Sequence, residues 1–310
     1  MILTVTANTA VDKRYVTEHF QAGEVNRVKS VALSAGGKGL NVSRAASIAG
    51  EEVLATGFLG GHNGRLIEEL LAGDGIRGDF VWCKGESRDC INIWDETLRT
   101  QTEFLEPGFE IGKEDEARLA EKFESCIDRA GVVTISGSVP RGSGAHLYGQ
   151  LLEIAKKHGK KAILDTSGQL LADSIAFRPY MIKPNIDEIR MLTGMPMDNM
   201  DDILAAAKKL HGAGISCVVI SLGASGAVMS CEEGAWQVVV PKVDAVNTVG
   251  CGDSMIGGFA VATERGLSMP EALRFAASVS TAAAMTPGTG TYRPEDQAAV
   301  FEKISLKVLN

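Results

Sequence analysis

The pattern of apolar and polar positions divides the chain into stretches of different character. In the first quarter, short apolar runs predict buried strands and helical periodicity predicts amphipathic helices. The strands are expected at 2–6 and 53–59, and the helices at 39–49, ending at Gly50, and through 65–71. The next segments, 80–82, 90–94 and 102–105, are predicted as short strands with no helix between them.

From Lys113 onward, strand and helix patterns alternate regularly. Repeated β-α units predict a doubly wound α/β fold in which a mostly parallel sheet carries helices on both faces. The expected strands are 132–136, 162–165, 180–183 and 218–221, followed by a hairpin formed by 227–230 and 236–240. Helices are expected at 147–157, in the stretch between 183 and 218, and at 253–264, 270–285 and 295–304.

Two helix-free stretches, at about 13–35 and 85–106, do not fit this layering. Because they carry strand patterns without helices, we expect them to pair into a small β-sheet that covers one end of the main sheet as a lid. The sequence contains no Pro/Ser-rich linker, low-complexity tract or internal repeat. We therefore predict a single domain over residues 1–310, with the lid segments inserted in its α/β core.

Composition and charge narrow the functional classes. The net charge of −8 and the pI near 5.3 argue against a nucleic-acid surface, which needs clustered Lys and Arg. The six cysteines form no C-x-x-C pair, so we interpret them as buried reduced thiols rather than a zinc site. Residues 1–6 lack the features of a signal peptide, and no apolar run reaches the roughly 18 residues of a membrane span. A cytoplasmic protein is expected.

The segment Asn247-Thr-Val-Gly-Cys-Gly-Asp253 precedes an apolar helical pattern. Gly250, Cys251 and Gly252 can turn successive backbone N–H groups toward one point, where the helix dipole adds positive potential. Such an anion hole suits the oxygens of a transferring phosphoryl group, and Asp253 at its edge can accept the proton of an attacking hydroxyl. The alternative is a glycine turn in which Asp253 only caps the helix.

A second glycine-rich segment, Gly36-Gly-Lys38-Gly-Leu-Asn41, lies between a lid stretch and the first helix. It can bring backbone and side chains close to a polyol, or it can be a simple turn; Ala32 excludes the P-loop nucleotide motif. Arg27 and Arg88 fall in the two lid segments. Single lid charges are usually solvated, but two arginines together suit a phosphate already present on the substrate.

Two polar segments follow predicted strands, where open α/β sheets bind ligands. In Lys183-Pro-Asn185-Ile-Asp-Glu188, Asn185 and Glu188 have the spacing of a capping box, but their oxygens also suit Mg²⁺ and its waters. In Ser221-Leu-Gly223-Ala-Ser-Gly226, the glycines can admit a nucleotide or merely turn the chain. The five histidines show no metal-ligand spacing.

In this order, four motifs resemble those of the ribokinase-like (PfkB) carbohydrate kinases. They are Asn8-Thr-Ala-Val-Asp12, Gly36 to Asn41, Lys183 to Glu188 and Asn247 to Asp253, and the likeness runs along nearly the whole chain. Gly23-Glu-Val-Asn-Arg27-Val and Ser136-Gly-Ser138-Val-Pro140 are similar to the branch that contains 1-phosphofructokinase and tagatose-6-phosphate kinase.

The resemblance implies a kinase that uses ATP and Mg²⁺ to phosphorylate a ketohexose phosphate, tagatose 6-phosphate or fructose 1-phosphate, and a homodimer formed through the lid. It implies that Asp253 is the catalytic base and that Gly250, Cys251 and Gly252 form the anion hole. It assigns Asp12, Gly37, Lys38 and Asn41 to the sugar hydroxyls, Arg27, Arg88 and Ser138 to the sugar's phosphate, Lys183, Asn185, Ser221, Gly223 and Gly226 to the nucleotide, and Glu188 with Asn185 to magnesium.

Two positions depart from the family pattern. Thr9 stands where the branch commonly has proline, and Asn247 replaces the aspartate of ribokinases proper, so potassium dependence is not predicted. The alternatives are a kinase for an unphosphorylated sugar or a nucleoside, and a non-catalytic sugar-phosphate sensor. Arg88-Asp-Cys90-Ile91 is slightly more similar to the tagatose-phosphate enzymes. A nicotinamide-dependent oxidoreductase is excluded because no G-x-G-x-x-G follows the first strand.

Overall fold

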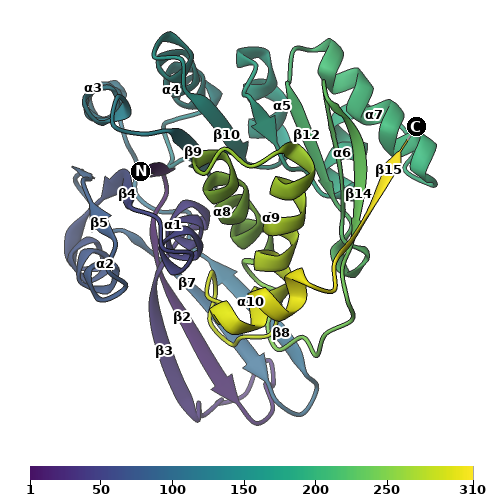
Figure 1. Cartoon of the computed structure of the whole chain (residues 1–310). Coiled ribbons are helices and arrows are strands. Elements are labelled where there is room, and N and C mark those ends of the chain that lie inside the picture. Colours follow the sequence, from purple (N-terminus) through teal and green to yellow (C-terminus); the bar gives the residue numbers. More distant parts are fainter. Residues whose placement is uncertain (310) are drawn as a thin grey trace.

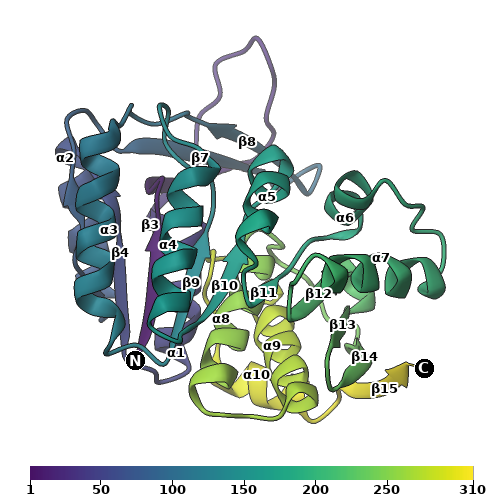
Figure 2. The ribbon, with the colours of Figure 1, turned by 90° about the horizontal axis from the view of Figure 1, so that it is seen from above.

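The computed structural model describes residues 1–309, and its main body is an 11-stranded sheet with helices on both faces (Figures 1 and 2). The strand order is β15-β14-β13-β12-β11-β10-β9-β1-β4-β5, and β6 also pairs with β4. The parallel strands are β1 (Ile2–Thr6), β4 (Val53–Leu59), β5 (Arg77–Gly78), β6 (Val81–Trp82), β9 (Val132–Ser136), β10 (Lys161–Asp165), β11 (Met181–Ile182) and β12 (Cys217–Ser221); the antiparallel strands are β13 (Ala227–Cys231), β14 (Gly234–Val239) and β15 (Ser305–Leu309).

Alternate residues of the central strands face opposite helix layers, as strand geometry requires. On β1, Leu3 and Val5 belong to one apolar core and Ile2 to the other. The first core is covered by α3 (Lys113–Ile127), α4 (Ala145–Lys157), α5 (Gly168–Ser174), α6 (Ile186–Thr193) and α7 (Met200–Gly212), and the second by α1 (Lys38–Ile48), α2 (Gly61–Gly73), α8 (Cys251–Glu264), α9 (Met269–Ala284) and α10 (Pro294–Phe301). The predicted doubly wound α/β fold is confirmed.

Helix α8 is buried along most of its length because it lies between α1, α9 and the sheet. Small residues make this close packing possible. A Cβ added to Gly258 would lie 2.6 Å from the Cα of Ala276 in α9, and one added to Gly257 would lie 2.8 Å from the Cβ of Ala45 in α1. The helix therefore holds the residues of its first turn in a fixed position relative to the sheet.

A separate four-stranded sheet, called here the small sheet, has the order β3-β2-β7-β8. It consists of β2 (Ala10–Thr17), β3 (Ser30–Gly36), β7 (Arg88–Asp95) and β8 (Thr100–Leu105), with β2 and β7 parallel and the other pairs antiparallel. The predicted pairing of the two helix-free stretches is confirmed, although β2 begins before residue 13. Figure 1 shows this sheet extending beyond α1 and α10, away from the main body.

Several elements were not predicted from the pattern. The helices α3 and α5 and the short strand β5 lie in stretches for which the pattern predicts no specific element, and the last helix ends at Phe301 rather than continuing to 304. The remaining residues form β15, which pairs with β14 at the edge of the main sheet. No helix among residues 1–309 is long and apolar enough to cross a bilayer.

Candidate active site

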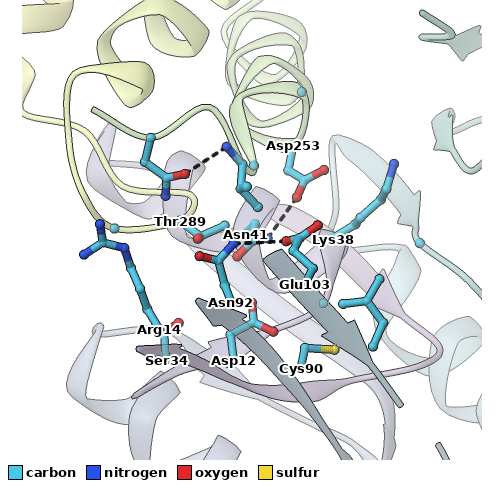
Figure 3. A pocket seen from close by; sticks show the side chains of 18 of the residues that line it. Asp12, Arg14, Ser34, Lys38, Asn41, Cys90, Asn92, Glu103, Asp253 and Thr289 are labelled. Carbon is cyan, nitrogen blue, oxygen red and sulfur yellow. Dashed lines mark hydrogen bonds between the residues drawn. The ribbon is translucent and has the colours of Figure 1, made fainter. Parts of the chain in front are cut away.

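A cavity of about 810 Å³ lies between the small sheet and the carboxyl ends of β10, β11 and β12 (Figure 3). Most of the residues selected from the sequence line it. These are Asp12, Gly37, Lys38, Asn41, Arg88, Ser138, Lys183, Asn185, Glu188, Ser221, Gly250, Gly252 and Asp253. The segments that supply these residues are far apart in sequence, and the fold brings their side chains together around one cavity.

The loop before α8 has the geometry of an anion-binding turn. Gly250 caps the helix with φ +78°, and a Cβ there would lie 2.5 Å from Cγ2 of Thr289, so this position requires glycine. Asn247 shapes the loop, because its Oδ1 accepts from the N–H of Val249 at 3.0 Å and its Nδ2 donates to the carbonyl of Pro287. Among residues 1–309, the N–H groups of Gly252 and Asp253 donate no hydrogen bond, as expected in a helix's first turn. An anion placed here would face unpaired donors and the positive end of α8.

Asp253 lies in the first turn of α8 and is 7% exposed. Its Oδ2 accepts a 2.8 Å hydrogen bond from Nδ2 of Asn41, on α1. Burial raises the pKa of Asp253; Lys38 opposes the rise, and the nearby Asp165 adds to it. A carboxylate that is buried and oriented in this way can act as a proton acceptor for a hydroxyl in the cavity.

The orientation of Asn41 is set by a residue that the sequence motifs did not identify. Arg44, one turn further along α1, donates from Nη1 to Oδ1 of Asn41 at 3.2 Å, which leaves the Asn41 amide nitrogen directed at Asp253. The same guanidinium, 4% exposed, also bonds Asp74, the carbonyl of Ala35 and the carbonyl of Thr289. Arg44 therefore connects α1, the end of α2, the small sheet and the 286–291 loop.

A second unpredicted residue, Asp165, lies at the end of β10 between two lysines. Its carboxylate is 3.4 Å from Nζ of Lys38 and 3.5 Å from Nζ of Lys183. Burial alone would raise the pKa of Asp165, but Lys183 and Lys38 lower it overall, and Asp165 raises the pKa of Lys38. Asp165 and Lys38 therefore both stay charged. Lys183 also lies close to the anion-binding turn, since a Cβ on Gly252 would be 3.2 Å from its Nζ.

Asp12 extends from β2 into the cavity (Figure 3). Gly36 lies directly against it, and a Cβ at that position would fall 2.1 Å from Cγ of Asp12. Burial raises the pKa of Asp12 to about 7; Arg44 and Arg88 oppose the rise, while Asp253 and Glu103 contribute to it. Two acidic groups with raised pKa values, Asp12 and Asp253, thus face one cavity, which is typical of a functional site.

Arg88 and Ser138 meet at one end of the cavity through Asn8. Arg88 donates to the carbonyl oxygens of Asn8 and Glu106, and Nδ2 of Asn8 donates to Oγ of Ser138 at 3.2 Å. The Nε of Arg88 is buried without a partner in the described chain. This end therefore combines a fixed guanidinium with a hydroxyl, the groups that suit a phosphate.

Asn185 and Glu188 form a capping box at the start of α6. The Asn185 side chain accepts from the N–H of Glu188 at 2.8 Å, and the Glu188 carboxylate accepts from the N–H of Asn185 at 2.9 Å. Both residues also line the cavity, so their oxygens serve the helix start and face the site at once. No cluster of three or more potential metal-binding His, Cys, Asp or Glu side chains occurs in residues 1–309.

Four of the residues selected from the sequence do not line the cavity. Gly223 and Gly226 lie in a turn closed by a hydrogen bond from Leu222 to the carbonyl of Gly226, beyond the cavity-lining Ser221. Cys251 follows the anion-binding turn with its thiol directed at the carbonyl of Asn247, and burial raises its pKa to about 11. Arg27 is exposed in the loop between β2 and β3.

Comparison with known proteins identifies relatives of this arrangement. The family model described as "pfkB family carbohydrate kinase" matches residues 3–296. The chain is similar to phosphofructokinase-2 from Escherichia coli, with 29% identity, a TM-score of 0.92 and coverage of 97% of this chain and 98% of that one. It is also similar to a possible 1-phosphofructokinase from Thermotoga maritima (26% identity, TM-score 0.91, both chains fully covered) and to a putative phosphofructokinase from Staphylococcus aureus (28%, 0.86, 100% and 99% covered).

Proposed function

The chain belongs to the pfkB family of carbohydrate kinases, and we propose that it transfers the γ-phosphoryl group of ATP to a hydroxyl of a ketohexose phosphate, either tagatose 6-phosphate or fructose 1-phosphate. The observation that carries the proposal is the Asn41–Asp253 pair beside the anion-binding turn of α8, inside the main cavity. The proposal includes a cytoplasmic location and a single functional domain that carries the small sheet as a lid.

In the proposed reaction, the acceptor hydroxyl lies against Asp253, which takes its proton as the oxygen attacks the γ-phosphorus. The bond between the γ-phosphorus and the β,γ-bridging oxygen breaks, and ADP leaves with that oxygen. The N–H groups of Gly252 and Asp253 and the ammonium groups of Lys38 and Lys183 lie where they can neutralise charge on the transferring group. Asn41 keeps the carboxylate of Asp253 in position.

We assign magnesium, which accompanies ATP in such reactions, to the side of the cavity lined by Asn185 and Glu188. Their oxygens are hard donors of the kind that Mg²⁺ and its waters prefer. Because one oxygen of Glu188 and the oxygen of Asn185 already accept backbone hydrogen bonds, contact through water fits better than a fully protein-ligated ion. The bound ion would supply positive charge next to the nucleotide phosphates.

The phosphate already on the acceptor is assigned to the end of the cavity formed by Arg88 and Ser138. Support comes from the similar Escherichia coli phosphofructokinase-2, which has been solved in complex with fructose-6-phosphate. Asp12 lies on the same face of the small sheet as Arg88 and would accept hydrogen bonds from sugar hydroxyls. Arg27 lies outside the cavity of its own chain, so its proposed contact with the phosphate has to be made in a second copy.

A second copy is proposed to pack on the small sheet, so that the loop carrying Arg27 reaches the cavity of its partner. Large apolar side chains are exposed on β3, β8 and the loop between β2 and β3: Val25 (85%), Val28 (43%), Val31 (51%) and Phe104 (54%). Exposed apolar residues gathered on one sheet are typical of a protein interface, and most soluble oligomers are symmetric. One similar solved structure is of a tetrameric form of phosphofructokinase-2. In sedimentation experiments the wild type should be a dimer and Phe104→Asp should be a monomer. A monomeric wild type would contradict the proposed dimer.

The test of the function is ADP release with MgATP and a panel of acceptors: tagatose 6-phosphate, fructose 1-phosphate, fructose 6-phosphate, fructose, ribose and a nucleoside. The highest kcat/KM is expected for a phosphorylated ketohexose. Asp253→Asn should lower kcat by about 10²–10⁴-fold with nucleotide binding nearly intact. If only unphosphorylated acceptors react, the assignment of Arg88 fails; if no acceptor reacts but a sugar phosphate binds, the chain is a sensor.

A further inference from the structure

The face of the small sheet that borders the cavity carries two rows of side chains. The strand register places Ser34, Asp12, Cys90 and Leu105 side by side in the first row, and Ala32, Arg14, Asn92 and Glu103 in the second. All eight residues line the cavity, and Figure 3 shows Arg14, Asn92 and Glu103 around the same space as Asp12. The proposed function uses the first row through Asp12 and leaves the polar second row without a role.

The second row contains a donor and an acceptor that lack partners. Within the described residues, the Nε of Arg14 and the Oδ1 of Asn92 are buried without a hydrogen bond. These two residues are direct neighbours across β2 and β7. Leaving a buried polar group unpaired costs about 1–3 kcal/mol, so such a pair calls for an explanation.

Glu103 determines which way the Asn92 amide points. Nδ2 of Asn92 donates to Oε1 of Glu103 at 3.3 Å, from the β8 side of the row. The amide oxygen is therefore on the other side of the group, toward β2 and Arg14. Without the Glu103 acceptor, the amide could rotate and donate elsewhere, and the unpaired acceptor next to Arg14 would be lost.

A hydroxyl group fits this pair, because it can accept from the Arg14 guanidinium, which donates no hydrogen bond in the described chain, and can donate to Oδ1 of Asn92 once a small side-chain rotation exposes that buried atom to the cavity. An ionised phosphate fits poorly, since it only accepts hydrogen bonds and would face the carboxylate of Glu103. Arg14 and Asp12 are two positions apart along β2, which corresponds to about 6–7 Å. A six-carbon acceptor is long enough to contact both rows.

We propose that Arg14, Asn92 and Glu103 form a hydroxyl-binding subsite that selects the configuration of the acceptor at a carbon remote from the one that is phosphorylated. Arg14 and Asn92 contact the hydroxyl, and Glu103 is a positioning residue that acts through Asn92. The inference rests on the proposed sugar-phosphate kinase function, and it adds the residues that distinguish one ketohexose phosphate from its epimer.

The test compares tagatose 6-phosphate with fructose 6-phosphate, which differ only in the configuration at C4, in the wild type and in Asn92→Leu. Leucine keeps the shape of asparagine and removes both polar atoms. In Asn92→Leu, the ratio of the kcat/KM values for the two epimers should move toward unity by about tenfold or more. A tenfold change corresponds to the free energy of one uncharged hydrogen bond. The KM for ATP should stay within about twofold of the wild-type value. Glu103→Gln retains an acceptor for Asn92 and should keep most of the ratio, whereas Glu103→Leu should lose it.

Thr102→Val is the matched control, because it removes one polar atom from the opposite face of β8 and should leave the ratio unchanged. If Asn92→Leu lowers both kcat/KM values equally and preserves their ratio, Asn92 is structural and the inference is overturned. If the wild type phosphorylates neither epimer nor any other sugar phosphate, the proposed function itself fails, and the subsite falls with it. The two failures are thus distinguished by the wild-type assay.

Discussion

Asp12 provides a direct test of how burial affects acceptor binding in this cavity. Its pKa is raised from 3.8 to about 7, chiefly by burial, so the group changes charge within the working pH range of most proteins. The ionised fraction should fall from about nine-tenths at pH 8 to about one-tenth at pH 6. If the ionised carboxylate is the form that accepts from sugar hydroxyls, the Kd for the acceptor should rise about tenfold over that interval.

The assay is calorimetric titration of the acceptor in the absence of nucleotide at pH 6, 7 and 8, for the wild type and Asp12→Asn. The acceptor's own phosphate has a pKa near 6 and titrates in both proteins, so the difference between them isolates Asp12. The variant should bind more weakly than the wild type at pH 8, and the gap should narrow at pH 6. If the wild-type Kd changes with pH no more than the variant's, the argument from burial is refuted.

The same shift predicts a change in stability with a definite sign. Because the folded pKa of Asp12 lies above its unfolded value, its contribution to stability is present below pH 3.8 and is lost as the pH rises through about 7. Asp12→Asn should therefore unfold at a higher denaturant concentration than the wild type at pH 8, and the difference should shrink toward pH 4. A variant that is less stable at pH 8 would show that Asp12 makes compensating contacts in the free protein.

Three further changes test separate parts of the structure. Arg44→Met should lower kcat more than it raises the KM for ATP, and should shift the acid limb of the profile of kcat against pH, because the Asn41 amide is released from Asp253. An unshifted profile would show that Arg44 contributes only to the stability of the fold. Glu188→Gln retains an acceptor for the helix cap and should raise the Mg²⁺ concentration needed for half-maximal rate, unless magnesium binds elsewhere. Gly258→Val should lower the unfolding midpoint sharply in thermal denaturation, because its Cβ would lie 2.6 Å from Ala276.

The parts of the site that could be predicted carry local sequence signals. Asp253 follows a glycine turn at the start of an apolar helix, and Lys183 follows a buried strand whose end points to the ligand edge of an α/β sheet. Asp165 has the same placement at the end of β10, but a lone aspartate without glycines or a cap pattern carries no local motif. Its charge at the carboxyl end of a buried strand is the one sequence signal of its role.

Other residues could not have been found from local pattern alone. Arg44 resembles any arginine on a helix, and its importance comes from Asp74 and Thr289, which lie 30 and 245 positions away in sequence. The second row of the small sheet depends on the register of four strands, which the alternation of residues does not specify between distant segments. The position of Arg27 in a lid segment predicts that it lies near the site, but it lies in an exposed loop that does not line the cavity of its own chain.

The small sheet contributes one wall of the cavity through residues of its four strands, whereas Asp253, Lys183 and Asp165 come from the main body. Substitutions at the cavity-facing positions can alter the shape and polarity of one wall while the main-sheet hydrogen bonds and the packing of α8 stay the same. New acceptor preferences could therefore arise through a few single-codon changes in β2, β7 and β8, each with little effect on folding. In evolutionary terms, the small sheet is a region where a lineage can explore substrates without rebuilding its chemistry.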